Sequence, residues 1–317
     1  MPTGLTLSFP PIVFAAFQMM FAMITPALIT GAIADRMKFS SWIVFSTAWL
    51  IVVYAPIAHW VFSPSGWLYK LGVEDFAGGT VVEANAGASA IAIAIVLGAR
   101  KGWPRESMRP HSVPFVILGA GILWFGWFGF NAGSALAANE TSAFAFVNTN
   151  IAGAAGLLGW MGWERYKNGH PTTLGAASGA IAGLVAITPS CGFISPMASA
   201  FVGVAAGIVC ASAITLKHRV KIDDSLDVFG VHLVAGVLGT IFIGFVSINS
   251  YNHSATKGLL TGGGAALLEH QLIAVIAVIA YAFIATFLLA HLIKRTIGLR
   301  VTPDDESRGL EIGRAHV

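Results

Sequence analysis

The stretch Asp75-Phe-Ala-Gly-Gly-Thr-Val-Val-Glu83-Ala-Asn-Ala-Gly87 carries an acid into the middle of an apolar run. Residues 84–98, which follow Glu83, contain no charged side chain. If this run spans a membrane as a helix, Glu83 lies about two turns below Asp75, because each residue rises about 1.5 Å. An acid at that depth costs at least about 2.5 kcal/mol unless a partner compensates it. The stretch therefore predicts that Glu83 is a functional residue.

The second half of the chain repeats this layout in Asp224-Ser-Leu-Asp-Val-Phe-Gly-Val-His232-Leu-Val-Ala-Gly236. In both stretches an acid is followed by a titratable residue and then, one helical turn later, by a glycine. Matching elements in two halves of a membrane chain indicate an internal repeat with a site at its interface. We therefore expect Glu83 and His232 to face each other in mid-membrane. The alternative is a buried pair that only holds two helices together.

The composition is that of a polytopic membrane protein, because 56% of the 317 residues are hydrophobic and only 10% are charged, with a mean hydropathy of +0.76. Soluble domains carry roughly 25% charged residues. The net charge of +3 is spread over loops, so it does not indicate a nucleic-acid partner. Metalloprotease, nucleophile-elbow and phosphate-loop motifs are absent from the sequence, so we expect neither an enzyme nor a metal or cofactor.

Uncharged runs close to the ~20 residues that cross a bilayer predict nine spans. These are approximately 12–33, 41–62, 77–97, 113–130, 142–162, 174–190, 194–216, 227–248 and 267–293. With the loops alternating across the membrane, Lys70 and Lys257 fall on one side and the other 16 of the 18 Lys and Arg residues on the opposite side. This asymmetry predicts a multi-pass protein of the plasma (inner) membrane with a cytoplasmic C-terminus.

The span count predicts an incomplete first half. The second half, about 113–248, has five spans, whereas the first, about 12–97, has three, so we expect two helices to be missing at the N-terminus. The predicted division is a transmembrane domain over 1–293, with its final helix at about 267–293, and a cytoplasmic tail over 294–311. Residues 312–317, Ile-Gly-Arg-Ala-His-Val, read like an in-frame sequencing adaptor, so an artefact is expected there.

Four stretches together resemble the ammonium transporter (Amt/Mep/Rh) family, and the similarity runs from about residue 12 to 310. They are Asp75-Phe-Ala-Gly-Gly-Thr-Val-Val82, Gly126-Trp-Phe-Gly-Phe-Asn-Ala-Gly-Ser134, Asp227-Val-Phe-Gly-Val-His232 and Gly31-Ala-Ile-Ala-Asp-Arg36. The resemblance implies an all-α fold of eleven helices with inverted five-helix repeats, of which about nine are present here. It also implies one pore per subunit and a homotrimer.

The resemblance assigns Glu83 and His232 to the family's two mid-pore histidine positions, from which this sequence departs by having Glu at the first. A Glu–His pair can be an ion pair or a neutral pair. Asp75 matches an aspartate near the outer mouth that favours the cation, and the alternative role is a helix N-cap. Trp127 is expected either to line the pore or to pack in the core.

The outer gate of the family is matched by Phe21 and Phe130, which the resemblance implies are stacked, and Ser134 matches a hydroxyl that accepts a hydrogen bond from the cation. Ordinary packing is the alternative for all three. Phe62 lies near the position of a vestibule tryptophan, shifted by one residue through an apparent insertion around 63–65. An aromatic face attracts a desolvated cation by up to ~2 kcal/mol, and phenylalanine is a poorer partner than tryptophan.

The function implied is uptake of ammonium, which is captured outside, deprotonated at the gate and conducted as ammonia into the cytoplasm, with a separate proton relay. One alternative is a sensor that binds ammonium with little flux. Another is a proton-coupled antiporter that uses the Glu83–His232 pair. Besides ammonium and the lipid bilayer, the resemblance implies a PII regulatory protein at the tail.

Overall fold

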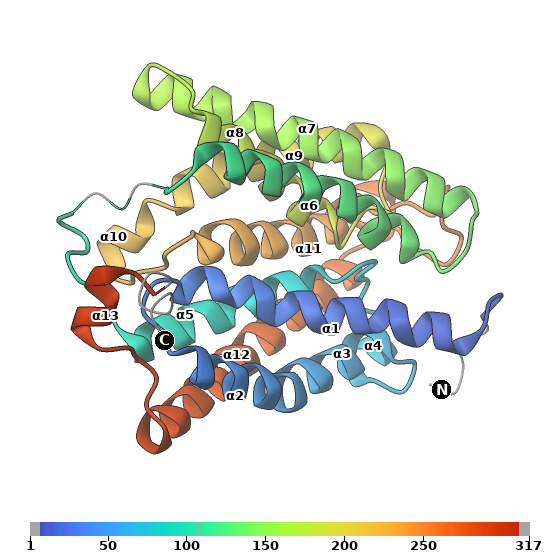
Figure 1. Cartoon of the computed structure of the whole chain (residues 1–317). Coiled ribbons are helices and arrows are strands. Elements are labelled where there is room, and N and C mark those ends of the chain that lie inside the picture. Colours follow the sequence, from blue (N-terminus) through green and yellow to red (C-terminus); the bar gives the residue numbers. More distant parts are fainter. Residues whose placement is uncertain (1–6, 107, 109, 311–317) are drawn as a thin grey trace.

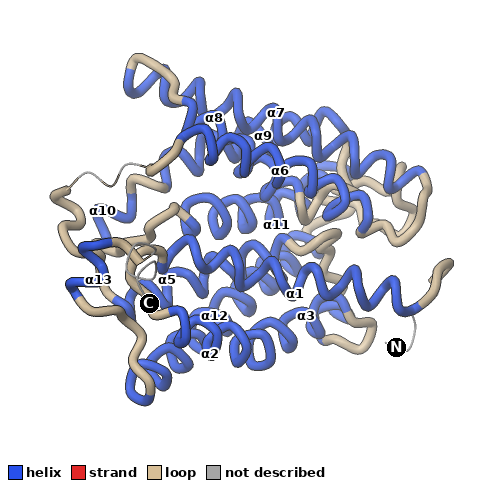
Figure 2. Tube along the Cα trace, viewed as in Figure 1, coloured by secondary structure: helices blue, strands red, loops and turns tan. Residues whose placement is uncertain are grey.

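The structure is a computed structural model that describes residues 7–106, 108 and 110–310, so the artefact expected at 312–317 lies outside the described residues. These residues form helices joined by loops and contain no β-strand, apart from one isolated bridge between Met37 and Arg300 (Figure 2). The prediction of an all-α membrane fold is confirmed.

The helices follow one another as α1 (Pro11–Ile33), α2 (Phe39–Trp49), α3 (Ala55–Phe62), α4 (Trp67–Leu71), α5 (Asn85–Leu97), α6 (Val113–Gly133), α7 (Glu140–Asn168), α8 (Thr173–Ile187), α9 (Pro196–Ala213), α10 (Leu216–Val220), α11 (Val234–Val246), α12 (Ala266–Thr296) and α13 (Pro303–Arg308). Three π-helical segments precede α3, α5 and α11, namely η1 (Leu50–Tyr54), η2 (Gly79–Ala84) and η3 (Phe229–Leu233), and a 3₁₀ turn, η4 (Leu259–Thr261), precedes α12.

Seven helical segments of the described chain are long and apolar enough to cross a membrane. The other two predicted spans correspond to α7 and α8. α7 is long, but Asn148 and Asn150 make its middle less apolar, and α8 is a shorter apolar helix of 15 residues. The sixth predicted span is therefore shorter than expected, because its last residues form turns after Ile187.

The helices lie roughly parallel in three layers (Figure 1). α6 to α9 form one layer, α1, α5 and α11 lie in the middle, and α2 and α12 lie below. Small residues allow close contact within the first layer. A Cβ on Gly156 of α7 would lie 2.4 Å from the carbonyl oxygen of Gly179 and 2.8 Å from the Cα of Gly183, both on α8. Backbones that approach so closely pack well without a hydrophobic driving force.

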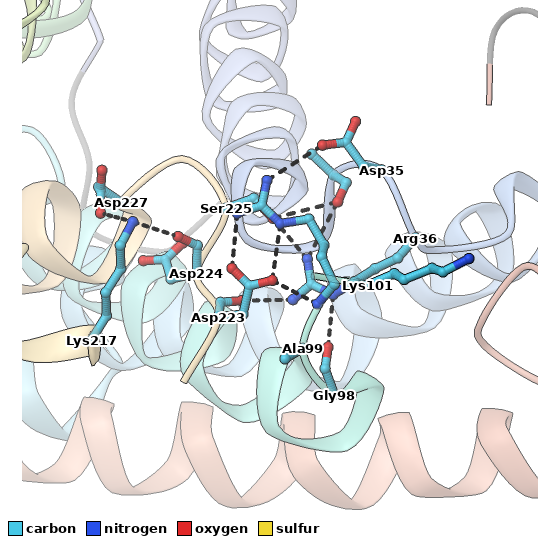
Figure 3. Close-up of polar contacts among 12 residues, drawn as sticks. Asp35, Arg36, Gly98, Ala99, Lys101, Lys217, Asp223, Asp224, Ser225 and Asp227 are labelled. Carbon is cyan, nitrogen blue, oxygen red and sulfur yellow. Dashed lines mark hydrogen bonds and ion pairs between the residues drawn. The ribbon is translucent and has the colours of Figure 1, made fainter. Parts of the chain in front are cut away.

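Arg36, Arg100, Lys217 and Arg300 gather at one end of the bundle, which we call the basic end. Arg36 is fully buried there, and its guanidinium donates hydrogen bonds to the carbonyl oxygens of Gly98 and Asp223 and to the Ser225 hydroxyl (Figure 3). Burial lowers the pKa of Arg36 to about 10, which still leaves it charged at neutral pH. The hydrogen bonds of Arg36 link the end of α1 to the end of α5 and to the segment that leads into η3.

Candidate functional site

Glu83 and His232 meet inside the bundle, with 2.6 Å between the Glu83 Oε2 and the His232 Nδ1. The Glu83 side chain is fully buried, and that of His232 is 12% exposed. Both residues lie in π-helical segments, η2 and η3, whose single wide turns are frequent at functional sites. The structure therefore brings together the two residues that the sequence repeat predicted to face each other.

The glycine of each repeated stretch, Gly87 in the first and Gly236 in the second, packs against the other stretch. A Cβ on Gly87 would lie 2.5 Å from the backbone nitrogen of Leu233, and a Cβ on Gly236 would lie 2.8 Å from the Cβ of Glu83. Gly87 thus lies against Leu233, and Gly236 lies against Glu83, so the two segments run antiparallel. The glycines allow the close approach that lets the two titratable side chains bond directly.

The Glu83–His232 pair keeps polar atoms that have no hydrogen-bond partner in the described part of the chain. Glu83 Oε1 is buried and has no hydrogen-bond partner there, and His232 uses only its Nδ1. A buried unpaired carboxylate oxygen is costly. The arrangement can therefore accept a hydrogen bond at Glu83 and exchange a proton within the pair, which is the chemistry expected of a relay.

Aromatic rings cluster between this pair and the end opposite to the basic end. The Phe21 and Phe130 ring centroids are 4.6 Å apart, but the planes are tilted by 43°, so the rings are in contact without the parallel stacking that the resemblance implied. Trp127 stacks on Phe130 at 5.3 Å, and its indole nitrogen donates to the Thr188 hydroxyl. Phe62 meets Phe21 edge to face at 6.4 Å. All four predicted aromatic residues thus lie in one cluster.

A pocket of about 250 Å³ opens on this cluster. Its lining includes Phe21, Phe62 and Ser134, which were predicted from the sequence, together with Gln18 and Phe76, which were not. The Ser134 hydroxyl donates to the Phe130 carbonyl oxygen at 2.8 Å, which directs its lone pairs away from that bond. A signal for Gln18 was available, because it lies one turn before Phe21 on α1.

Asp75 caps the start of η2. Its Oδ1 accepts hydrogen bonds from the backbone nitrogens of Gly78 and Gly79, at 2.8 and 2.7 Å, and its Oδ2 accepts from the backbone nitrogen of Thr80 at 2.8 Å and from the Thr80 hydroxyl. Asp75 does not line the 250 Å³ pocket. The N-cap is the role that these contacts support, whereas the attraction of a cation by Asp75 stays a prediction.

Asp224 occupies the equivalent position in the second half, at the basic end (Figure 3). Its Oδ2 accepts a hydrogen bond from the backbone nitrogen of Phe229 at 2.6 Å, and its buried Oδ1 has no partner in the described chain. Burial, reinforced by the nearby charge of Asp227, raises the pKa of Asp224 to about 6. The adjacent Asp223 differs, because the Arg100 guanidinium binds both of its oxygens at 2.9 Å and keeps its pKa below the usual range despite burial.

We expect Asp224 to make the folded protein less stable as the pH rises. A carboxyl group whose folded pKa lies above its unfolded value binds its proton more tightly when folded, so its contribution to stability is lost between about pH 4 and pH 6. A shift from 3.8 to about 6 corresponds to about 3 kcal/mol. Asp224→Asn should therefore gain stability relative to the wild type between pH 4 and pH 7.

Thermal unfolding of the detergent-solubilised protein, followed by tryptophan fluorescence, measures this difference. Asp304→Asn, on the exposed turns of α13, is the matched control and should keep the wild-type pH dependence. Identical pH profiles for the wild type and Asp224→Asn would show that Asp224 binds its proton equally well in the folded and unfolded states.

Comparisons with known proteins agree with this architecture. The model of the Ammonium Transporter Family matches residues 5–316. An ammonium transporter of Mycobacterium tuberculosis (strain ATCC 25618 / H37Rv) is 51% identical over 316 residues, which cover 95% of this chain and 66% of the relative. The ammonium transporter Amt1 of Archaeoglobus fulgidus is 46% identical over 96% of this chain and 76% of its own length.

Solved structures show the same fold. Saccharomyces cerevisiae Mep2 superposes with a TM-score of 0.88 at 36% identity, covering 94% of this chain and 68% of the Mep2 chain. A structure named Sensor Amt Protein superposes with a TM-score of 0.86 at 33% identity and covers 94% and 75% of the two chains. The chain spans about two thirds of the length of the mycobacterial relatives, and it belongs to the Ammonium Transporter Family.

Proposed function

We propose that this chain carries ammonium across the plasma membrane, entering at the pocket beside Phe21 and leaving at the basic end. The observation that carries the proposal is the order of the groups: a pocket with aromatic walls and a serine hydroxyl, then an aromatic constriction, then a buried Glu–His pair. The asymmetry of the basic residues supports placing the basic end and the C-terminal tail in the cytoplasm.

Each step follows from the physics of a small cation. In the pocket, the face of Phe62 attracts ammonium and Ser134 accepts one of its hydrogen bonds, while Phe130, which contacts Phe21, attracts the ion toward the constriction. At the contact between Phe21 and Phe130 the ion would lose its water, and a bare charge in an apolar constriction carries a large desolvation cost that neutral ammonia does not. The substrate therefore gives up its proton near the gate and passes Glu83 and His232 as ammonia, while the pair relays the proton.

We expect Phe130→Ala to weaken ammonium uptake at low concentration. Loss of a cation–π contact worth up to ~2 kcal/mol predicts a rise of up to about thirtyfold in the apparent KM. Phe125→Ala is the matched control, because Phe125 lies on the same helix but is 79% exposed on its outer surface. Uptake of a labelled ammonium analogue into cells measures both variants, and equal KM values would remove Phe130 from the capture site.

Relay of the proton predicts that one charge crosses for each ammonium taken up. Proteoliposomes on a solid-supported membrane should therefore give an inward current when ammonium is added, and the current should saturate with the ammonium concentration. Ammonium-dependent flux without current would contradict the relay. An antiporter that uses Glu83 and His232 would keep its current in Phe130→Ala and Ser134→Ala, so these variants discriminate between the two transport mechanisms.

A second candidate function is sensing, and the similarity to the protein named Sensor Amt Protein supports it. In that case ammonium would bind at the pocket and produce little flux.

We further propose a homotrimer, since α6 exposes large apolar side chains such as Phe115 and Phe125, which lipid or another copy must cover. A PII protein is proposed to dock on the tail, of which residues 294–310 are described.

A further inference from the structure

Glu74 immediately precedes Asp75, at the end of the bundle opposite to the basic end, and is partly buried. Its Oε1 accepts a hydrogen bond from the backbone nitrogen of Thr256, and its Oε2 accepts one from the Ser247 hydroxyl at 3.2 Å. Both donors belong to residues 247–258, which follow α11 and which we call the 247–258 loop. One acid of the first half of the chain thus binds a loop of the second half.

The backbone of Glu74 is held by a separate set of hydrogen bonds. Its nitrogen donates to the Gln271 Oε1 at 2.9 Å, and its carbonyl oxygen accepts from the Gln271 Nε2 at 2.6 Å. Gln271 is fully buried on α12, and its Nε2 also donates to the Thr240 carbonyl oxygen on α11 at 3.2 Å. Loss of the Glu74 carboxylate would therefore release the 247–258 loop and leave the backbone of Glu74 bound to α12.

The 247–258 loop reaches the 250 Å³ pocket through two aromatic rings. The backbone nitrogen of Ile248 donates to the Phe193 carbonyl oxygen at 2.8 Å. The Phe193 ring meets the Phe76 ring edge to face, with centroids 5.4 Å apart and planes at 88°. Phe76 lines the pocket in which we propose that ammonium is captured. The loop therefore supports one wall of this pocket from behind.

The geometry of the loop makes that support depend on Glu74. The base of the loop is closed, because the backbone nitrogen of Gly258 donates to the Ser247 carbonyl oxygen at 2.9 Å. Its middle is held on α7, where the Thr141 hydroxyl donates to the Tyr251 carbonyl oxygen at 2.7 Å. The carboxylate of Glu74 joins the closed base to the segment that contains Asp75 and Phe76.

We propose that Glu74 is a positioning residue of the capture pocket: its carboxylate holds the 247–258 loop behind Phe76, and protonation of Glu74 from outside loosens this wall and weakens ammonium capture. The inference rests on the proposed function and adds a dependence on external pH. Hydrogen bonds to an ionised carboxylate are roughly twice as strong as neutral ones, so protonation weakens the hold on Thr256 and Ser247.

Burial raises the pKa of Glu74, although the hydrogen bonds from Thr256 and Ser247 oppose the shift, so Glu74 binds its proton at a less acidic pH than an exposed glutamate does. The other titratable or charged groups near it are Asp75 on its own segment, Tyr69 and Lys70 on α4, Tyr251, His253 and Lys257 on the loop, and Glu269 and His270 on α12. Among the described residues, none of these side chains bonds the Glu74 carboxylate. The two histidines also titrate near neutral pH, so the test includes them.

The test is uptake of a labelled ammonium analogue into cells at external pH values between about 4.5 and 7, which span the titration of a glutamate with a raised pKa. We expect the apparent KM of the wild type to rise at least about threefold as the pH falls. Glu74→Gln keeps the shape of the side chain but cannot titrate, so its KM should be raised at every pH. At any one pH the two proteins should reach the same maximal rate, because Glu74 acts on capture.

Three control variants should keep the wild-type pH profile of the KM. Glu269→Gln removes the same charge from an exposed position at the start of α12, at the same end of the bundle. His253→Gln and His270→Gln remove the two neighbouring histidines. A pH profile that became flat in either histidine variant would assign the effect to that histidine and overturn the role of Glu74.

A spin label gives a second readout that does not depend on transport. Ser254→Cys places the label on an exposed position of the 247–258 loop, whereas Cys191 and Cys210 are buried and should stay unlabelled. We expect the label to become more mobile as the pH falls when Glu74 is present, and to be mobile at every pH in Glu74→Gln.

The outcomes separate this inference from the proposed function. Equal KM values for the wild type and Glu74→Gln at every pH would overturn the inference, and so would a label whose mobility ignores both the pH and the substitution. Absence of ammonium-dependent uptake by the wild type would instead contradict the proposed function, and the label would still decide whether Glu74 holds the loop.

Discussion

His232→Ala is expected to abolish growth on limiting ammonium in a strain that lacks its own ammonium transporters. The substitution removes the partner of Glu83 Oε2, and because Glu83 Oε1 already has none in the described chain, a buried carboxylate would be left without hydrogen bonds. Breaking one side of a buried charged pair typically costs about 3–5 kcal/mol. The variant should therefore lose both the proton relay and part of its stability.

Two further variants separate these effects. Adding Glu83→Gln to His232→Ala removes the buried charge, so stability should return while transport does not. His291→Ala is the matched control, because His291 is another partly buried histidine, whose Nδ1 lies 3.0 Å from the Phe287 carbonyl oxygen on α12. Growth with His232→Ala at the wild-type rate, with the protein present in the membrane, would refute transport through the mid-pore pair.

Gly87→Ala is expected to reduce the yield of folded protein. The new Cβ would lie 2.5 Å from the backbone nitrogen and 2.7 Å from the Cα of Leu233, and backbone atoms cannot move aside as a flexible side chain can. Overpacking of this kind typically costs about 1–3 kcal/mol. Because Gly87 and Glu83 lie one turn apart, the same displacement would also lengthen the bond from Glu83 to His232.

Size-exclusion chromatography and thermal unfolding measure this loss. Gly121→Ala on α6 is the control, since its Cβ would meet no atom within 4 Å, and alanine in a helix is up to about 1 kcal/mol more favourable than glycine. Gly236→Ala, whose Cβ would lie 2.8 Å from the Cβ of Glu83, should resemble Gly87→Ala. If Gly87→Ala and Gly121→Ala behaved alike, the two antiparallel segments would be free to separate.

Much of the fold was predictable because the decisive signals are local. Each of the nine uncharged runs contains helix in the structure, and the eight-residue spacing shared by Asp75–Glu83 and Asp224–His232 predicted that Glu83 and His232 meet across the bundle. The π-helical turns were not predictable, since nothing in the sequence of residues 79–84 distinguishes them from an ordinary helix. The segment η2 begins where Asp75 accepts hydrogen bonds from several backbone nitrogens at once.

Contacts made by charged residues with partners far away in the sequence were harder to predict. Arg36 entered the sequence analysis as a loop charge and as the last residue of a family motif, with no partner assigned, yet its guanidinium binds Ser225, which is 189 residues away. Charge and spacing predict on which side of a membrane such a residue lies, but its partner depends on how loops from different helices converge. The 250 Å³ pocket shows the same limit, because Gln18 and Phe76, which both line it, come from segments far apart in the sequence.

The distance in sequence between Glu83 and His232 has a consequence for how the protein is made. The two residues are 149 positions apart, and synthesis at about 5–20 residues per second separates their appearance by about 7–30 s. During that interval α1, α2 and α5 can enter the bilayer while the histidine has not yet been synthesised. Glu83 is therefore synthesised first, and its partner His232 reaches the bundle only when η3 and α11 follow.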